Sequence, residues 1–220
     1  MCFTPAVSLA TAIIEWFLAL VLIILFRKSK LTPIFSIVFL LLGIYQFTEF
    51  MLCFSLNLIW VKIGFIAYSF LPVLGLQATL IYLKRKINLV LLYLIPVVYS
   101  LFAIFSTNFA LSATCMRLFV SVKLIISQSP LFALPYMIYY TFFILISFIF
   151  MVNEYVRTKD KKRKKVSILI ALSILCMTAP TLVVTQVFPM LNIAFPSVLC
   201  HFALFLAILL FIAVSIDRKG

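Results

Sequence analysis

Residues 34–55 read IFSIVFLLLGIYQFTEFMLCFS, an apolar run long enough for one α-helix to cross the hydrocarbon core of a bilayer. Within this run, Gln46 and Glu49 place an amide and a carboxyl group three residues apart, on the same face of a helix. A charged side chain at the centre of a membrane helix costs about 2.5–3.5 kcal/mol on insertion scales, so Glu49 is a candidate functional residue that needs a partner. The run therefore predicts a membrane span that carries a polar site.

The rest of the chain has the composition of an integral membrane protein. Of its 220 residues, 66% are hydrophobic and 10% are charged, and the mean hydropathy is +1.30. A single water-soluble core could not bury so much apolar surface. The formal net charge of +13 does not indicate nucleic-acid binding, because the basic residues lie between apolar runs and not on a soluble folded face. We expect the lipid bilayer to be the main partner and nucleic acid not to be one.

Seven apolar runs have the length of a transmembrane helix, so we expect one all-α domain over residues 1–220, a seven-helix transmembrane bundle. These runs cover residues 6–26, 34–55, 60–83, 88–106, 131–155, 166–187 and 196–216. The first run is expected to be an uncleaved span and not a signal peptide, because Glu15 lies at its centre and basic residues follow it.

The basic residues predict how the bundle is oriented. Of the 18 Lys and Arg residues, all but Lys62, Arg117 and Lys123 lie after the first, third and fifth runs or at the carboxyl end. With seven spans, all of these positions fall on one side of the membrane. The positive-inside rule then places the amino terminus outside and the carboxyl terminus in the cytoplasm.

The longest loop outside the runs, residues 107–130, shows alternating apolar and polar residues. Val120, Val122 and Leu124 alternate with Ser121 and Lys123. Alternation with period two predicts a β-strand, which we expect to be one arm of a hairpin over the mouth of the bundle. A short helix at the membrane interface is the alternative.

Three side chains that titrate as acid or imidazole fall inside the runs, namely Glu15, Glu49 and His201. At about 1.5 Å of rise per residue, all three lie in the outer half of their spans. The first, second and seventh helices are adjacent in a ring of sequential neighbours, so one cluster can hold all three side chains. The expected ligand- or proton-binding residues are Glu15, Gln46, Glu49, His201, Tyr45 and Ser8, with Ser197 beside them.

Two interpretations of this cluster remain open. In the functional one, it binds a ligand or a cation, or relays a proton, because such residues are costly inside lipid. In the structural one, Glu15 and Glu49 are protonated, or one of them pairs with His201, and the cluster only ties three helices together.

The cysteines add a weaker prediction. Cys115 in the long loop can form a disulfide with Cys2 or with Cys53, and the spacing does not decide between these partners. Cys53, Cys200, Glu49 and His201 are suitable ligand types for a metal. We nevertheless expect no metal site, because the chain has one His and no paired-ligand motif.

The sequence lacks the common catalytic motifs. It has no Gly-rich phosphate loop and no Ser–His–Asp set, and its only Asp residues, Asp160 and Asp217, lie in segments expected to be cytoplasmic. We therefore do not expect an enzyme. The seventh run contains no Lys, so it cannot form a retinal Schiff base, and no cofactor is expected.

The first quarter of the chain holds a short set of motifs: Met1-Cys2 at the start, Ser8 in the first run and Gln46-x-x-Glu49-Phe50 in the second. By these motifs it resembles a family of uncharacterised, stand-alone, rhodopsin-like seven-transmembrane proteins. The resemblance implies a rhodopsin-like ring of helices without a chromophore, and it implies no reaction.

A second, more distant resemblance rests on Trp60, Gly64 and Pro72 in the third run and on the basic loop between the fifth and sixth runs. By these features the chain looks like the seven-span sensor module at the amino terminus of bacterial histidine kinases. This resemblance implies that the protein is a sensor. No output domain precedes Gly220, so we expect the signal to pass to a separate signalling partner.

Taken together, these features predict a receptor-like or ligand-binding module of the cell membrane, with a polar site in the outer half of the first, second and seventh helices. The alternatives are a proton- or cation-coupled transporter that uses Glu15 and Glu49, or a structural membrane subunit. The loop from Arg157 to Lys165 is expected either to carry the signal or to anchor the topology and touch anionic lipid.

Overall fold

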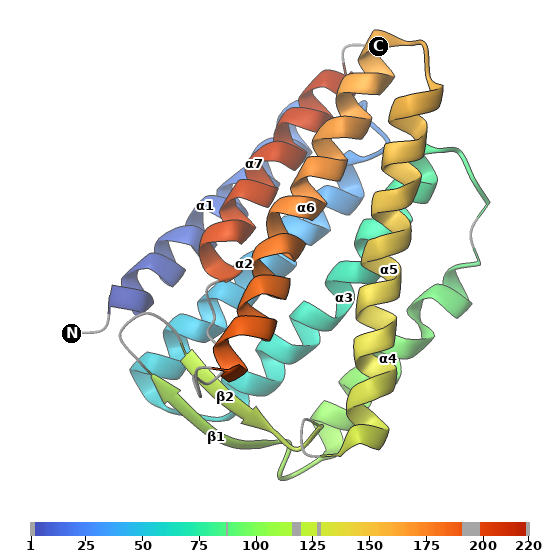
Figure 1. The fold of residues 1–220 in the computed structure, drawn as a ribbon. Helices are drawn as coiled ribbons and strands as arrows, with labels where there is room; N and C mark the ends of the chain where they lie inside the picture. The colour runs from blue at the N-terminus through green and yellow to red at the C-terminus, as the bar shows by residue number, and fades with distance from the viewer. Residues whose placement is uncertain (1–2, 87, 116–119, 127–128, 191–198, 219–220) are drawn as a thin grey trace.

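The computed structural model describes residues 3–86, 88–115, 120–126, 129–190 and 199–218, with side chains described except at 3–4, 120–121, 180–190 and 199–201. These residues form seven helices and one β-hairpin (Figure 1). In chain order the elements are α1 (Phe3–Leu25), α2 (Thr32–Ser55), α3 (Ile59–Tyr82), α4 (Leu89–Phe105), β1 (Ala110–Cys115), β2 (Val120–Leu124), α5 (Pro130–Arg157), α6 (Lys161–Met190) and α7 (Leu199–Arg218). Each helix overlaps one of the seven predicted runs, which confirms their helical structure.

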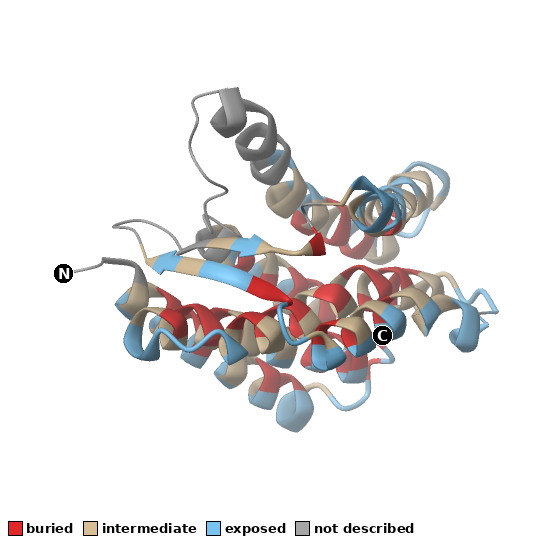
Figure 2. Ribbon diagram, turned by 90° about the horizontal axis from the view of Figure 1, so that it is seen from below, coloured by how far each residue is buried: buried red, intermediate tan, exposed pale blue. Residues whose placement is uncertain are grey.

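Four of the described helices are long and apolar enough to cross a membrane: α1 from Pro5, α2, α3 and α5. Helix α4 is apolar but shorter, with 17 residues. Large apolar side chains point outward from the bundle, for example Phe17, Val90 and Leu131, which are 63%, 77% and 77% exposed. In Figure 2 the buried residues gather on the faces that the helices turn toward one another. This is the distribution expected where lipid replaces water around the helices.

The helices follow one another around a ring. Helix α1 contacts α2, α2 contacts α3, α3 contacts α5, α5 contacts α6, α6 contacts α7, and α7 returns to α1 and α2. Helix α4 packs on α3 from outside this ring, and the Tyr99 hydroxyl in its second half donates to the carbonyl of Phe132 in α5 at 2.8 Å. The sequence prediction that the first, second and seventh helices are adjacent is therefore confirmed.

The two ends of the bundle differ in character. The hairpin end holds β1 and β2 and the turn between α2 and α3, whereas the basic end holds the α1–α2, α3–α4 and α5–α6 connections (Figure 1). Local signals set several helix limits at these ends. Pro33 and Pro130 lie in the first turns of α2 and α5, and the Asn88 side chain caps α4 by accepting from the Val90 amide at 3.2 Å.

Small residues let neighbouring helices approach closely, as is common in membrane bundles. In α2, Gly43 faces the Trp16 indole of α1, which lies where a Cβ at position 43 would be. In α3, Gly64 faces the Thr48 hydroxyl of α2, which would lie 2.5 Å from an added Cβ. Helix α7 presents Ala203, Ala207 and Ala213, each at most 1% exposed, to the core shared with α1 and α2.

The predicted strand is also confirmed, and the alternative of an interfacial helix is wrong. β1 and β2 pair antiparallel, with Ala113 opposite Val122 and a bulge between Ala110 and Ser112. Ala110 packs with Leu52 of α2 and Val61 of α3, so the hairpin covers the ends of these two helices. Burial of the inward-facing residues of the alternating pattern holds the hairpin on the bundle.

Candidate functional site

The structure brings the two membrane-embedded carboxyl groups together between α1 and α2. The side chains of Glu15 and Glu49 are 0% and 4% exposed, and the carboxyl groups are close enough to interact electrostatically. The Ser8 hydroxyl, also in α1, donates to Oε2 of Glu49 at 3.3 Å. Four of the residues predicted from the sequence thus lie in one buried cluster, which we call the carboxyl cluster: Ser8, Glu15, Gln46 and Glu49.

Gln46 belongs to this cluster by its position on α2. It precedes Glu49 by three residues, so the two side chains lie on the same helix face. The Gln46 side chain is 0% exposed, and its amide oxygen and nitrogen have no hydrogen-bond partner among the described residues. The same holds for both carboxyl oxygens of Glu15. A buried polar group left without a partner costs about 1–3 kcal/mol, and more if it is charged.

Tyr45 takes a different place from the one predicted. Its ring packs against α3, with the ring of Tyr68 at a centroid distance of 5.6 Å and Gly64 beside it. Adjacent residues on a helix point about 100° apart, so a tyrosine next to Gln46 turns toward a different neighbouring helix. We therefore assign Tyr45 to the α2–α3 interface.

His201 lies in the first turn of α7, the helix that contacts both α1 and α2. Its side chain lies outside the described part of the structure, as do the side chain of Cys200 and the whole of Cys2 and Ser197. Among the described residues, no group of three His, Cys, Asp or Glu side chains is arranged to hold a metal ion.

The disulfide joins Cys53 at the end of α2 to Cys115 at the end of β1, with their Cα atoms 5.5 Å apart. The sequence left Cys2 and Cys53 as alternative partners of Cys115, and the possible pair Cys2–Cys115 is wrong. The reason is geometric, because the hairpin packs on the ends of α2 and α3 and so brings β1 to Cys53. The pairing could not be chosen from spacing along the chain.

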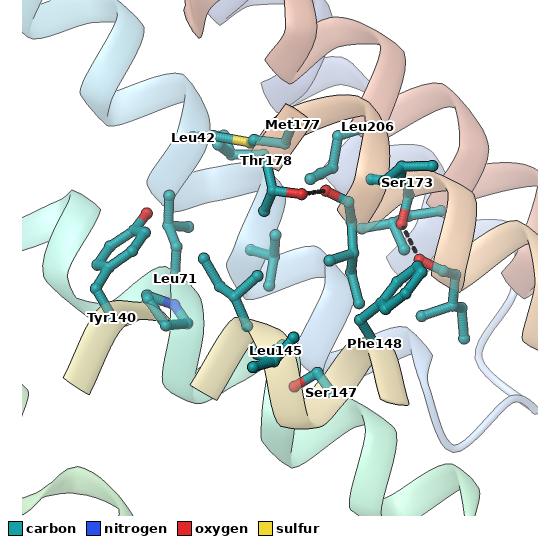
Figure 3. A pocket seen from close by; sticks show the side chains of 18 of the residues that line it. Leu42, Leu71, Tyr140, Leu145, Ser147, Phe148, Ser173, Met177, Thr178 and Leu206 are labelled. Atoms are coloured by element: carbon teal, nitrogen blue, oxygen red, sulfur yellow. Dashed lines mark hydrogen bonds between the residues drawn. The ribbon is translucent and has the colours of Figure 1, made fainter. Parts of the chain in front are cut away.

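A second site was missed in the sequence. A cavity of about 390 Å³ lies between α2, α3, α5, α6 and α7, and Figure 3 shows the side chains around it. Its lining is largely apolar, and none of the residues of the carboxyl cluster contributes to it. The transporter alternative therefore gains no support from this cavity. A signal for it was present in α6, where Ile170, Ser173, Met177 and Thr178 recur on one helix face.

The basic end carries a hydrogen-bond network that the sequence did not suggest. Ser29 in the α1–α2 turn donates to the Asp217 carboxylate of α7 at 2.5 Å, and Nζ of Lys162 in α6 donates to the Asp217 carbonyl at 2.7 Å. Nearby, Arg163 of α6 forms an ion pair with Glu154 of α5 at 2.9 Å. This network connects the ends of four different helices, α1, α5, α6 and α7, around the basic loop.

Comparison with known protein families identifies the family of the chain. The family described as the N-terminal seven-transmembrane region of histidine kinases matches residues 7–217. This match bears out the more distant of the two resemblances, the one carried by Trp60, Gly64, Pro72 and the basic loop. Searches of curated proteins and of solved structures give no match. The family and the apolar helices together identify a membrane-embedded helical bundle.

Proposed function

The chain belongs to the family of N-terminal seven-transmembrane regions of histidine kinases, and on this basis we propose that it is a membrane sensory module whose input is a positive charge bound at the carboxyl cluster. The bound species is a proton or a small monovalent metal cation. This proposal keeps four of the six site residues expected from the sequence. It restricts the bound species to a proton or a small cation, because the cluster is buried in the protein. Ser8, Glu15, Gln46 and Glu49 are each at most 4% exposed.

One observation carries the proposal. Two carboxyl groups interact inside the bundle while both oxygens of Glu15 and both amide atoms of Gln46 have no partner among the described residues. Two negative charges in a low-dielectric interior repel each other strongly. A proton or a cation between them removes this repulsion, and oxygen atoms of carboxylate, amide and hydroxyl groups are the ligands that hard cations prefer.

The proposed orientation follows from the positive-inside rule. The hairpin end faces the outside, the basic end faces the cytoplasm, and the cluster lies in the outer half of a rhodopsin-like bundle in the cell membrane. No cofactor and no catalytic activity are part of the proposal. The loop from Arg157 to Lys165 is proposed to touch anionic lipid and a separate signalling partner, which its charge and its position next to the α5–α6 ion pair support.

The structural interpretation, in which the cluster only ties α1 to α2, makes different predictions. If the cluster binds nothing, its neutral amide variants should be at least as stable as the natural protein and should respond to ions in the same way. If it binds a positive charge, the amide variants should lose that response. This difference makes the two interpretations separable in one experiment.

The test uses the fluorescence of Trp16, which follows Glu15 in the sequence and packs on Phe47 at a centroid distance of 5.7 Å. The chain has two Trp residues, so Trp60→Phe leaves Trp16 as the only reporter. The full chain in lipid nanodiscs is titrated with acid at constant salt, and separately with Na⁺ against choline at constant pH. We expect a saturable change in Trp16 emission in one of these titrations.

Two sets of variants show whether the carboxyl cluster is the source of the change in Trp16 emission. Glu15→Gln and Glu49→Gln, each in the Trp60→Phe protein, should abolish the change. Glu154→Gln, which removes a carboxylate at the basic end, should leave it intact. Emission that stays constant in both titrations, or that changes equally in all variants, would assign the cluster to helix packing.

A further inference from the structure

We propose that the cavity between α2, α3, α5, α6 and α7 binds a neutral, membrane-soluble molecule with an apolar body and one hydrogen-bond donor group, such as an alcohol. The inference is independent of the proposed cation site, since the two sites share no residue. The cavity volume of about 390 Å³ falls within the range of small-molecule sites, roughly 300–1,000 Å³. Five helices from different parts of the chain enclose it, so a bound molecule would contact most of the ring.

The lining residues exclude a charged ligand. None of them is Lys, Arg, His, Asp or Glu. Most are aliphatic or aromatic, including Phe35 and Leu42 of α2, Leu71 of α3 and Phe148 of α5. An ion in such surroundings would have no opposite charge to compensate for the loss of its hydration, whereas a neutral apolar molecule would be favoured. A membrane-soluble molecule can also reach this depth from the bilayer.

Three hydroxyl groups in the lining favour a ligand that donates a hydrogen bond. The side chains of Ser147, Ser173 and Thr178 donate to carbonyl oxygens of their own helices, those of Phe143, Ile170 and Ile174, at 2.6, 2.7 and 2.9 Å. Figure 3 shows the last two of these hydrogen bonds at the cavity wall. Because the hydroxyl hydrogens are already used, these oxygens are left to act as acceptors. A ligand that donates a hydrogen bond therefore fits better than one that only accepts.

One wall of the cavity is aromatic. The rings of Tyr68 in α3 and Tyr140 in α5 stack with centroids 4.6 Å apart and planes 16° from parallel. Both residues line the cavity. Stacked rings form a flat apolar surface against which an alkyl chain or a ring can lie.

Substitutions at Gly75 can be used to fill this cavity. It lines the cavity, and a Cβ added to it would meet no atom within 4 Å. Larger side chains at position 75 can therefore grow into the cavity without a clash at their first atom. Gly75→Ala removes little of the space and Gly75→Leu removes much more, so the two variants form a matched pair.

The experiment uses an eight-carbon alkanol that carries a diazirine as the photoreactive probe. The full chain in nanodiscs is illuminated with the probe, and the adducts are located by mass spectrometry of peptides. We expect saturable labelling of α3, α5 and α6 at cavity residues, with competition by excess 1-octanol and little competition by octanoate. Gly75→Leu should lower the labelling of these positions at least tenfold, while Gly75→Ala should lower it less than twofold.

A second variant keeps the test decisive where Gly75→Leu does not fold. Thr178→Phe fills the space from α6, on the opposite wall, and should reduce the same labelling. Adducts that spread over lipid-facing positions, do not saturate and persist in both filled variants would overturn the proposal, since they would show partition from the bilayer only. Equal competition by octanoate would overturn the neutral character of the ligand.

Discussion

The indole ring of Trp16 in α1 occupies the space that a Cβ at Gly43 in α2 would fill. Its Nε1 donates to the carbonyl of Leu40 at 3.3 Å, so the ring lies along the backbone of α2 for about one turn. Trp16 also follows Glu15 directly, so this contact fixes the height of the Glu15 carboxyl relative to Glu49. The alignment of the carboxyl cluster therefore depends on a glycine outside it.

Gly43→Ala is expected to destabilise the bundle by about 1–3 kcal/mol, the usual range for overpacking a close contact. The measurement is thermal unfolding in detergent. Gly75→Ala is the matched control, since its added methyl meets open space and Ala is favoured over Gly in a helix by about 0.5–1 kcal/mol. A Gly43→Ala protein as stable as the Gly75→Ala protein would contradict the close contact.

Gly64→Ala is expected to separate α2 and α3, because the added Cβ lies 2.5 Å from the Thr48 hydroxyl. The Thr48 hydroxyl cannot simply rotate away without cost, since it donates to the Tyr45 carbonyl at 2.7 Å. Gly64→Ala alone should lower the stability by about 1–3 kcal/mol. Thr48→Ala should recover most of the loss in the double variant, and two effects that merely add would show that the residues do not touch.

Loss of the disulfide is expected to release the hairpin from α2. Cys53→Ser and Cys115→Ser should each destabilise the protein by about 2–4 kcal/mol, the typical contribution of a disulfide. The double variant should be no worse than either single one, because both remove the same bond. Cys2→Ser serves as the control and should have no effect; a loss of stability in that variant comparable with Cys53→Ser would restore the pairing of Cys2 with Cys115.

The hydrogen bond from Ser29 to the Asp217 carboxylate is expected to couple α7 to the α1–α2 turn. Ser29→Ala and Asp217→Asn should each cost about 1.5–3 kcal/mol, the range for a hydrogen bond to a charged group, discounted where water reaches the basic end. A double-mutant cycle measures the coupling, which we expect to be positive and close to either single effect. A coupling energy near zero would show that these two side chains act independently.

The helices and the hairpin could be predicted because each depends on local pattern. Apolar runs of about 20 residues predict spans, and the alternation at Val120, Val122 and Leu124 predicts a strand. The largest difference between a predicted run and the observed helix is at α6, which begins at Lys161 and not at 166. Lysine favours helices and can extend its charged end to water, so the helix continues beyond its apolar run.

Features that depend on how the helices pack together could be predicted only in part from the sequence. The proximity of the Glu15 and Glu49 carboxyl groups was predictable, because it needs only adjacent helices and similar depth. The position of the Tyr45 ring was not predictable, because it depends on which neighbouring helix packs against that face of α2. The disulfide needed the position of the hairpin, and the cavity needed the side chains of five helices to leave a space unfilled.

The covalent bond between Cys53 and the hairpin has a mechanical consequence. Cys53 lies four residues beyond Glu49 on α2, a distance of about 6 Å along the helix axis at 1.5 Å per residue. A force on the hairpin is therefore transmitted to the carboxyl cluster over about one turn of one helix, through covalent bonds alone. Helix α2 continues from there to Leu42 at the cavity wall. A displacement of the hairpin would therefore move the carboxyl cluster and this wall of the cavity together.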